Sequence, residues 1–359
     1  MVLKMKKIAG ILAIVFLAAI LTVILMTILA LCLANAEEIK TAPEPDAIRA
    51  IYLSSDNIFN ERKIAELERI FITTKANGIV IDFKDSNSLS QETITNLMKR
   101  FKKHNVYTIA RIVVFQDSYF ARKHPEIAIK TSSGEFWYSG RKAWKRYWLD
   151  PASELAQDYN IEIAKRAIDA GFDEIQFDYI RFPTDGNMSD IRYPIFNPAM
   201  NSKAAVMEHF FKKMKSELKS YSPNTLIGID VFGIVFLNGK EPNISQTLSD
   251  IAEYFDVICP MAYPSHYMCG EFGVQDPTAH PYKVYYATLK NGLKFLDGKK
   301  VIIRPWIQNF SIASIYGCGP TVYYGYDNAH AQIQACRDLG INGFMLWNAN
   351  NNFTIEVLK

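Results

Sequence analysis

The chain has few of the features that mark nucleic-acid, metal or nucleotide binding. Its 40 Lys and Arg residues nearly balance 37 Asp and Glu residues, and no Lys/Arg-rich block follows the N-terminal segment. Its charge therefore predicts no nucleic-acid partner. The cysteines show no CxxC or clustered Cys/His spacing, so we predict no metal site. No glycine-rich phosphate loop follows the first expected strand, and no cofactor is implied.

Residues 1–36 form a separate, strongly apolar segment. Three lysines within the first seven residues precede an uncharged run from residue 8 to 34. This run exceeds the roughly 20 residues that span a bilayer, whereas a cleaved signal peptide has an apolar core of about 7 to 15. We expect a transmembrane anchor with the rest of the chain extracytoplasmic. The sequence Ala34-Asn35-Ala36 leaves cleavage and secretion open; a lipoprotein site at Cys32 is less favoured because Leu31 precedes it.

Residues 37–48, charged and proline-bearing, are expected to be a linker, and residues 49–359 a single (β/α)8 TIM barrel. After the linker, apolar β-branched runs alternate with segments of helical periodicity, which is typical of this fold. A doubly wound open sheet is the competing fold. The eight expected strands are 49–54, 78–83, 106–115, 174–181, 225–232, 256–263, 300–308 and 341–347.

The expected strand at 174–181 carries polar side chains inside an apolar run and ends in Arg-Phe-Pro. Read at period two, Gln176 and Asp178 share one face, while the other face is apolar. A carboxylate in a strand interior needs a polar destination. Since active sites of TIM barrels lie at the C-terminal ends of the strands, we expect Asp178 at such a site.

The same alternation, applied to the other strands, directs charged and aromatic side chains toward one mouth of the barrel. Buried Arg/Asp layers and core packing of the tryptophans are the structural alternatives. Large rings beside charged groups favour a sugar-binding surface. The candidate substrate-binding residues are Asp82, Lys84, Arg111, Arg181, Tyr263, Arg304, Trp306, Gln308 and Trp347.

Asp178 and Asp230 end adjacent expected strands and are the candidate catalytic pair. Neighbouring strands lie about 4.8 Å apart, which suits the roughly 5 to 5.5 Å between the carboxyl groups of retaining glycosidases. We predict Asp178 as nucleophile and Asp230 as acid/base. Asp82 is the reserve carboxylate, and Arg181 or Arg304 is expected to keep one carboxylate ionised.

Four cysteines lie outside the apolar segment. Cys259 falls in an expected strand and Cys336 in an expected helix, so both are expected to be buried thiols. Cys269 and Cys318 lie in glycine-rich loops and are the candidate disulfide, with free thiols as the alternative.

Five stretches resemble the bacterial and archaeal "putative glycosyl hydrolase" domain family of unknown function: 78–85, 110–115, 148–151, 171–183 and 343–347. The resemblance implies a carbohydrate-active barrel with Asp178 as its catalytic position. A fainter likeness to chitinase-type hydrolases rests on Asp173, Asp178, Met261-Ala-Tyr263 and Trp347. Ile180 stands where such enzymes carry their catalytic Glu, which argues against substrate-assisted chemistry.

These observations predict an extracytoplasmic glycoside hydrolase whose partner is a polysaccharide or oligosaccharide. Two alternatives remain. A non-catalytic polysaccharide-binding or envelope protein on a degenerate barrel would hold Asp178 on an arginine, with no second carboxyl within about 10 Å. A metal-dependent deacetylase would need ligands such as His266 and His280, which both lie in expected loops.

Overall fold

The computed structural model describes residues 22, 26, 43–84, 90–140 and 145–359. Residues Pro43–Lys359 form one compact unit, which contains every candidate site residue. The predicted anchor, residues 1–36, lies outside the described residues apart from Thr22 and Met26. Within the described residues, no helix has the length and apolar character needed to cross a membrane.

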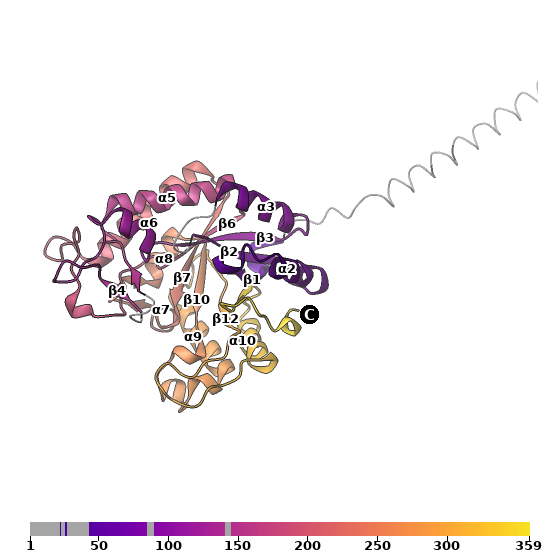
Figure 1. Ribbon diagram of the computed structural model, residues 1–359. Coiled ribbons are helices and arrows are strands. Elements are labelled where there is room, and N and C mark those ends of the chain that lie inside the picture. The colour runs from indigo at the N-terminus through magenta and orange to yellow at the C-terminus, as the bar shows by residue number, and fades with distance from the viewer. Residues whose placement is uncertain (1–21, 23–25, 27–42, 85–89, 141–144) are drawn as a thin grey trace, which may run out of the picture. The chain divides into compact units, whose positions relative to one another are not determined.

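The unit is an α/β fold around a TIM-barrel-like parallel sheet of nine strands (Figure 1). Each strand of this sheet pairs in parallel with its neighbours. In sheet order they are β11 (Ile302–Ile303), β10 (Val257–Met261), β7 (Leu226–Phe232), β6 (Glu174–Asp178), β3 (Tyr107–Val113), β2 (Gly78–Lys84), β1 (Arg49–Leu53), β13 (Phe344–Trp347) and β12 (Trp306–Gln308).

The two end strands of this order, β11 and β12, are consecutive pieces of one stretch of chain. Between them the Arg304 N–H donates to the Ile258 carbonyl at 3.0 Å, and the Pro305 carbonyl accepts from the Met345 N–H at 2.9 Å. The two residues between β11 and β12 therefore hydrogen-bond to β10 and to β13, the strands next to the two ends of the order. Since the first strand, β1, also pairs with the last, β13, the order is TIM-barrel-like and differs from a doubly wound sheet, in which the first and last strands are not paired.

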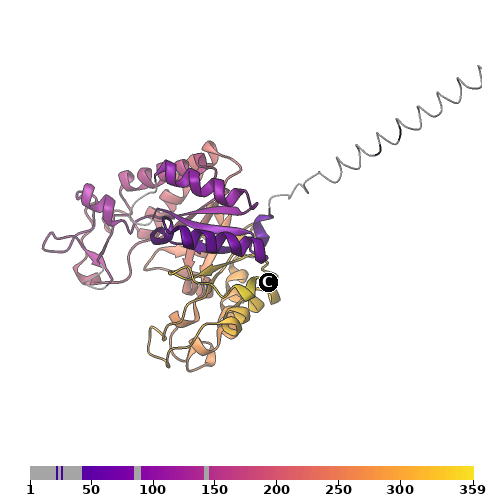
Figure 2. The same cartoon turned by 45° about the vertical axis from the view of Figure 1, so that its right-hand side comes forward.

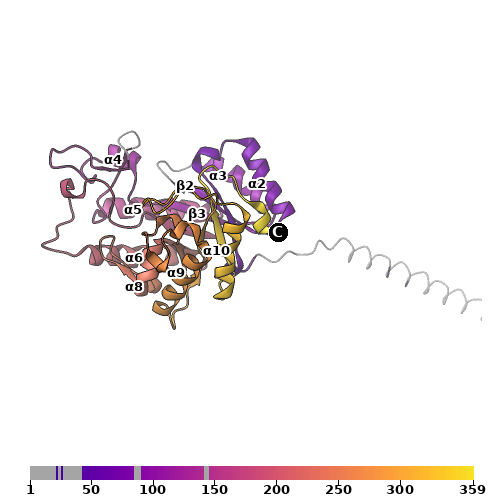
Figure 3. The same cartoon turned by 90° about the horizontal axis from the view of Figure 1, so that it is seen from below.

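Helices follow the strands and cover the outer face of the sheet (Figure 2). Asn60, Ser90, Ser153 and Ser202 cap four of them by accepting a backbone N–H three residues later. Helices α9 and α10 pack side by side (Figure 3). The helices are α2 (Glu61–Thr73), α3 (Gln91–Lys102), α4 (Ser118–Lys123), α5 (Glu154–Asp169), α6 (Lys203–Tyr221), α7 (Gly233–Asn238), α8 (Leu248–Tyr254), α9 (Pro281–Phe295) and α10 (Tyr326–Asp338).

Residues 43–48 pack with the compact unit, although the sequence places them in a linker. Pro45–Ala47 form a short 3-10 helix, and the Pro45 carbonyl accepts from Arg304 Nη2 at 2.7 Å. Ile48 is fully buried. The unit thus begins at Pro43, before the expected position 49.

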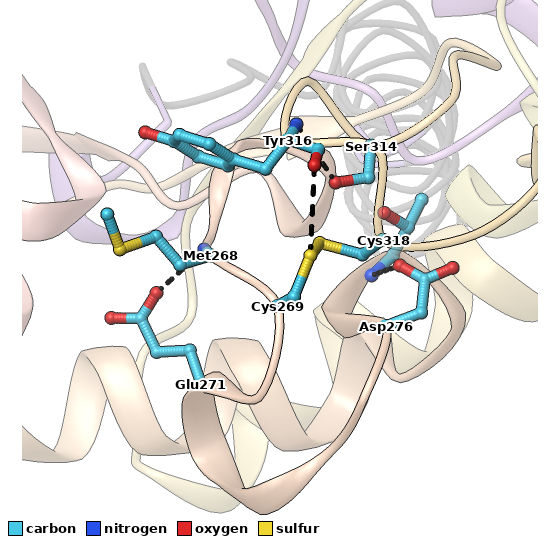
Figure 4. The surroundings of a disulfide bond; sticks show 8 residues. Met268, Cys269, Glu271, Asp276, Ser314, Tyr316 and Cys318 are labelled. Carbon is cyan, nitrogen blue, oxygen red and sulfur yellow. Dashed lines mark hydrogen bonds between the residues drawn. A yellow bond between two sulfur atoms is a disulfide. The ribbon is translucent and has the colours of Figure 1, made fainter.

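Two loops at the C-terminal side of the sheet are joined covalently. One follows β10 and the other follows β12, and a disulfide between Cys269 and Cys318 connects them with a Cα–Cα distance of 5.1 Å (Figure 4). This is the pair expected from the sequence. Cys259 and Cys336 are buried free thiols, as expected.

Candidate functional site

Asp178 and Asp230 lie side by side where β6 and β7 approach their C-terminal ends. In the register of these strands Phe177 is opposite Ile229, so the next residues along, Asp178 and Asp230, are neighbours. Both carboxyl groups are buried, with 7% and 3% of the residue exposed. The placement follows from the parallel pairing, which aligns the strand ends.

Arg111 of β3 is the cation that contacts this carboxyl pair. Its Nε and Nη2 donate to the same oxygen, Asp178 Oδ2, at 3.1 and 2.5 Å. Its Nη1 donates to Asp82 Oδ1 at 2.6 Å. The sequence predicted that Arg181 or Arg304 would hold a carboxylate of the pair, whereas Asp178 receives Arg111.

The two candidate catalytic carboxyls are close enough to flank one bond. Nε of Arg111 lies 3.1 Å from Asp178 Oδ2 and 3.9 Å from Asp230 Oδ2. These two oxygens are therefore at most about 7 Å apart, the sum of the two distances. That limit includes the roughly 5 to 5.5 Å of retaining glycosidases and the lower end of the roughly 6.5 to 9.5 Å of inverting ones.

The two carboxyls have different environments. Burial, together with the negative charge of Asp178, raises the pKa of Asp230 well above its usual value. Asp230 Oδ1 accepts from Gln176 Nε2 at 2.5 Å and from Trp306 Nε1 at 2.7 Å. Its Oδ2 is buried without a hydrogen-bond partner among the described residues. A proton on Oδ2 of Asp230 fits this arrangement, whereas Asp178 accepts two hydrogen bonds from Arg111.

Asp82 of β2 contacts Arg111 from the side away from Asp178. The Tyr52 hydroxyl donates to Asp82 Oδ2, and the Ser55 N–H lies 3.3 Å from the same oxygen. With Arg111 on its other oxygen, Asp82 is engaged on both sides. Asp82 thus fixes the guanidinium between the strands, and its role as reserve carboxylate stays a prediction.

A cavity of about 660 Å³ opens beside the carboxyl pair. Seven of the eleven predicted site residues line it: Asp178, Asp230, Arg111, Arg181, Tyr263, Trp306 and Trp347. Trp306 and Trp347 meet edge to face with ring centres 5.4 Å apart. The guanidinium carbon of Arg111 lies 5.5 Å from the centre of the Trp347 ring. Charged groups and aromatic rings thus share one wall of the cavity.

Lys84 lies away from the cavity, on the helix-facing side of the sheet. Its ammonium pairs with Asp117 Oδ2 at 2.9 Å and donates to Asn160 Oδ1 at 3.0 Å. The register of β2 against β3 shifts between Asp82 and Lys84, so Lys84 is opposite Ile112, whose side chain packs in the outer core. This bulge reverses the alternation of side chains, which the sequence does not reveal. Lys84 is therefore not among the residues that line the cavity, to which the sequence assigned it.

Arg304 and Gln308 also lie away from the cavity. Arg304 forms a fully buried ion pair with Glu174 at the start of β6, at 2.8 Å, so it lies near the opposite end of the strands from Asp178. Gln308 Oε1 accepts from the Ser265 N–H at 3.2 Å and orders the loop after β10. Period-two alternation predicts which face of the sheet Arg304 lies on, but not how far along the strand it lies.

Tyr179 is a cavity residue that the sequence reasoning missed. It has a positive φ of 50°, which is rare for a residue with a side chain, and it directly follows Asp178. Its N–H donates to Asp178 Oδ1 at 2.7 Å. No pattern in the sequence signals this turn. Gln176, in contrast, was expected to point into the barrel, and its side chain donates a hydrogen bond to Asp230.

The described residues contain no group of three or more His, Cys, Asp or Glu side chains that is arranged to hold a metal ion. His266 lines the cavity and its Nδ1 lies 2.9 Å from Ser265 Oγ. His280 precedes α9 and is not among the residues that line the cavity. The two histidines considered for a deacetylase therefore do not share the site.

Comparison with known families identifies the chain. Residues 86–353 match the family described as "Putative glycosyl hydrolase domain". The chain belongs to this family. The match covers most of the compact unit, including Arg111, Asp178, Asp230 and both cavity tryptophans. No curated protein matches the chain.

Solved structures of glycoside hydrolases share the fold of this family member. A plant class V chitinase mutant from Cycas revoluta, in complex with (GlcNAc)3, has a TM-score of 0.55 at 11% identity, covering 87% of this chain and 98% of that one. A GH36 alpha-galactosidase from Geobacillus stearothermophilus, in complex with stachyose, has a TM-score of 0.52 at 14% identity, covering 86% and 40%. A hypothetical protein from Ruminiclostridium thermocellum is 28% identical, covers 50% and 97%, and has a TM-score of 0.43.

Proposed function

We propose that this protein is an extracytoplasmic glycoside hydrolase that acts on a polysaccharide. It uses the carboxyl groups of Asp178 and Asp230 in a retaining mechanism. The observation that carries the proposal is the shared contact of Asp178 and Asp230 with Nε of Arg111, which limits their facing oxygens to about 7 Å. A two-carboxylate mechanism needs this proximity. Membership of the glycosyl hydrolase domain family supports the reaction class.

The environments of the two carboxyls assign their roles. Asp178, with Arg111 on Oδ2 and the Tyr179 N–H on Oδ1, is positioned as the nucleophile that attacks the anomeric carbon. Asp230, whose pKa is raised by burial, gives its proton to the leaving oxygen as the glycosidic bond breaks. In the second step Asp230 takes a proton from water, which then displaces Asp178 from the sugar.

The cavity wall supports a sugar as substrate. Trp347 is half-buried beside the carboxyl pair and offers its ring to an apolar sugar face, while Tyr263 and the buried Trp306 line the cavity behind it. Two proteins of similar fold were solved with oligosaccharides bound, a chitinase with (GlcNAc)3 and an alpha-galactosidase with stachyose. We infer a polysaccharide or oligosaccharide ligand for this cavity as well.

The extracytoplasmic location rests on two features of the chain. Residues 1–36 have the charge and length of a single-pass anchor, with secretion after cleavage as the alternative. The disulfide between Cys269 and Cys318 is of the kind that persists in oxidising compartments. Accessibility of the barrel to protease in intact cells tests this location.

The test of the function is hydrolysis of a panel of glycans by the full-length chain in mild detergent. We expect at least one glycan to be cleaved, and Asp178→Asn to lower the rate by about 10³-fold or more. Asp250→Asn, at an exposed position in α8, is the matched control and should retain the wild-type rate. Equal rates for wild type and Asp178→Asn would exclude the proposed nucleophile.

A non-catalytic binding protein is the second candidate, because Arg111 places two N–H groups on one oxygen of Asp178. A non-catalytic barrel would hold Asp178 on an arginine and would have no second carboxyl within about 10 Å. Arg111 meets the first condition, whereas the nearby Asp230 carboxyl fails the second and favours catalysis. Tight binding of a glycan that is never cleaved would support the binding protein, and release of acetate from an acetylated glycan would support a deacetylase.

A further inference from the structure

Arg181 is a buried cation that faces the same cavity as the carboxyl pair. It follows the end of β6 by three residues and only 6% of it is exposed. Its guanidinium carbon lies 5.0 Å from the centre of the Trp148 ring, 5.2 Å from that of Tyr179 and 4.6 Å from that of Phe232. Three rings therefore hold the side chain in place while it lines the cavity.

The hydrogen bonds of Arg181 within the described residues go to neutral oxygens. Nη1 donates to the Phe182 carbonyl at 3.0 Å and lies 3.4 Å from Thr184 Oγ1. Burial lowers the pKa of Arg181 below its usual value, in the direction expected when a charge leaves water without full compensation. A buried charge is ordinarily paired.

The nearby carboxylates do not supply this pairing. Asp178 is engaged by Arg111 on Oδ2 and by the Tyr179 N–H on Oδ1. Asp185 is exposed and lines the cavity, and it acts on Arg181 only through its charge. Arg111, the other cavity arginine, is held by Asp82 and Asp178. Arg181 is thus the cavity cation with capacity for a ligand anion.

We propose that Arg181 binds a carboxylate of the substrate, which makes the substrate a polysaccharide that contains a hexuronic acid. The planar guanidinium forms two parallel N–H···O bonds to a carboxylate, and Nε and Nη2 remain for this contact. The inference rests on the proposed function for the nature of the ligand. It adds the chemical group by which the cavity selects that ligand.

The binding test compares matched ligands on the wild-type full-length chain in detergent. The probes are hexuronate oligosaccharides of α and β linkage and the same oligosaccharides after reduction of the carboxyl to a hydroxymethyl group. Binding is followed by tryptophan fluorescence at low temperature, with cleavage measured separately. We expect at least one hexuronate oligosaccharide to bind about 10- to 100-fold more tightly than its reduced form.

Variants locate the preference. Arg181→Gln should abolish it, and Arg181→Lys should retain part of it because the charge is kept without the fork. Asp185→Asn should strengthen hexuronate binding alone, because a like charge is removed from the cavity. Arg192→Gln is the matched control, since Arg192 is exposed in the same loop and also donates to backbone carbonyls.

The outcomes separate this inference from the proposed function. Equal binding of the carboxylate and reduced ligands by wild type would overturn it, as would a preference that survives in Arg181→Gln. Tighter binding of a sulfated oligosaccharide than of every hexuronate would also overturn the assignment of a carboxylate. Preference without any cleavage would support the Arg181 site and reject the hydrolase, whereas cleavage of neutral glycans without preference would do the reverse.

Discussion

The indole N–H of Trp306 donates to Asp230 at 2.7 Å, on the oxygen that Gln176 also contacts. Two donors on Oδ1 leave Oδ2 as the oxygen that carries a proton. Trp306 is therefore more than a wall of the cavity. In the proposed mechanism, its hydrogen bond leaves Oδ2 of Asp230 as the oxygen that donates the proton.

The raised pKa of Asp230 predicts a pH-dependent cost in stability. The unfolded chain releases this proton near pH 3.9, whereas the native state keeps it to higher pH. The unfolding free energy therefore falls as the pH rises from about 4 toward the folded-state pKa. Asp230→Asn lacks this cost, so its stability relative to wild type should increase from pH 4 to pH 7 in urea unfolding. Asp250→Asn is the control, and a pH-independent difference for Asp230→Asn would contradict the assignment.

The roles of the two carboxyls predict different responses to the leaving group. Asp230→Asn should lose about 10²- to 10⁴-fold on a glycoside with a poor leaving group and far less on an activated aryl glycoside, which needs no proton. Asp178→Asn should be slow on both substrates. Initial rates with the two substrates measure this, and the reverse pattern would exchange the roles.

Arg111 should be worth much more to stability than a surface arginine. It lies between the carboxylates of Asp82 and Asp178, with about 8% of its side chain exposed. Arg111→Met leaves these charges buried and should cost about 3 to 5 kcal/mol in urea unfolding. Arg100→Met, which breaks the more exposed pairs with Glu61 and Glu68, is the control and should cost about 1 kcal/mol or less. Similar losses for both variants would show that Arg111 is not the electrostatic centre of the site.

The Cys269–Cys318 disulfide should stabilise the barrel and order the rim of the cavity. It closes a loop of 49 residues in sequence, and Met268 and Tyr316, both cavity residues, lie beside it (Figure 4). Replacing both cysteines by serine should lower the unfolding free energy by about 2 to 4 kcal/mol. Reductant should lower the melting temperature of wild type and leave that of the double variant unchanged. An equal effect on both proteins would mean that the bond does not contribute.

The sequence was sufficient for the elements and for part of the site because both depend on local patterns. Apolar alternation located all eight expected strands, of which the stretch at 300–308 is divided into β11 and β12. The same alternation brought six predicted residues to one cavity, which Arg181, just past the end of its strand, also lines. It was wrong for Lys84 because a bulge in β2 reverses the face, and wrong for Arg304 because the alternation carries no information on depth.

The sequence by itself determined that polar side chains lie at the C-terminal ends of parallel strands. It did so through the two-residue period of strand side chains and the carboxylate at position 178 within an apolar strand. Only the tertiary structure decided which cation contacts Asp178. Arg111 lies 67 positions before Asp178 in the chain and reaches it because β3 and β6 pair side by side. It likewise decided that the pKa of Asp230 is the one raised, since burial and neighbouring charge are properties of the packed structure.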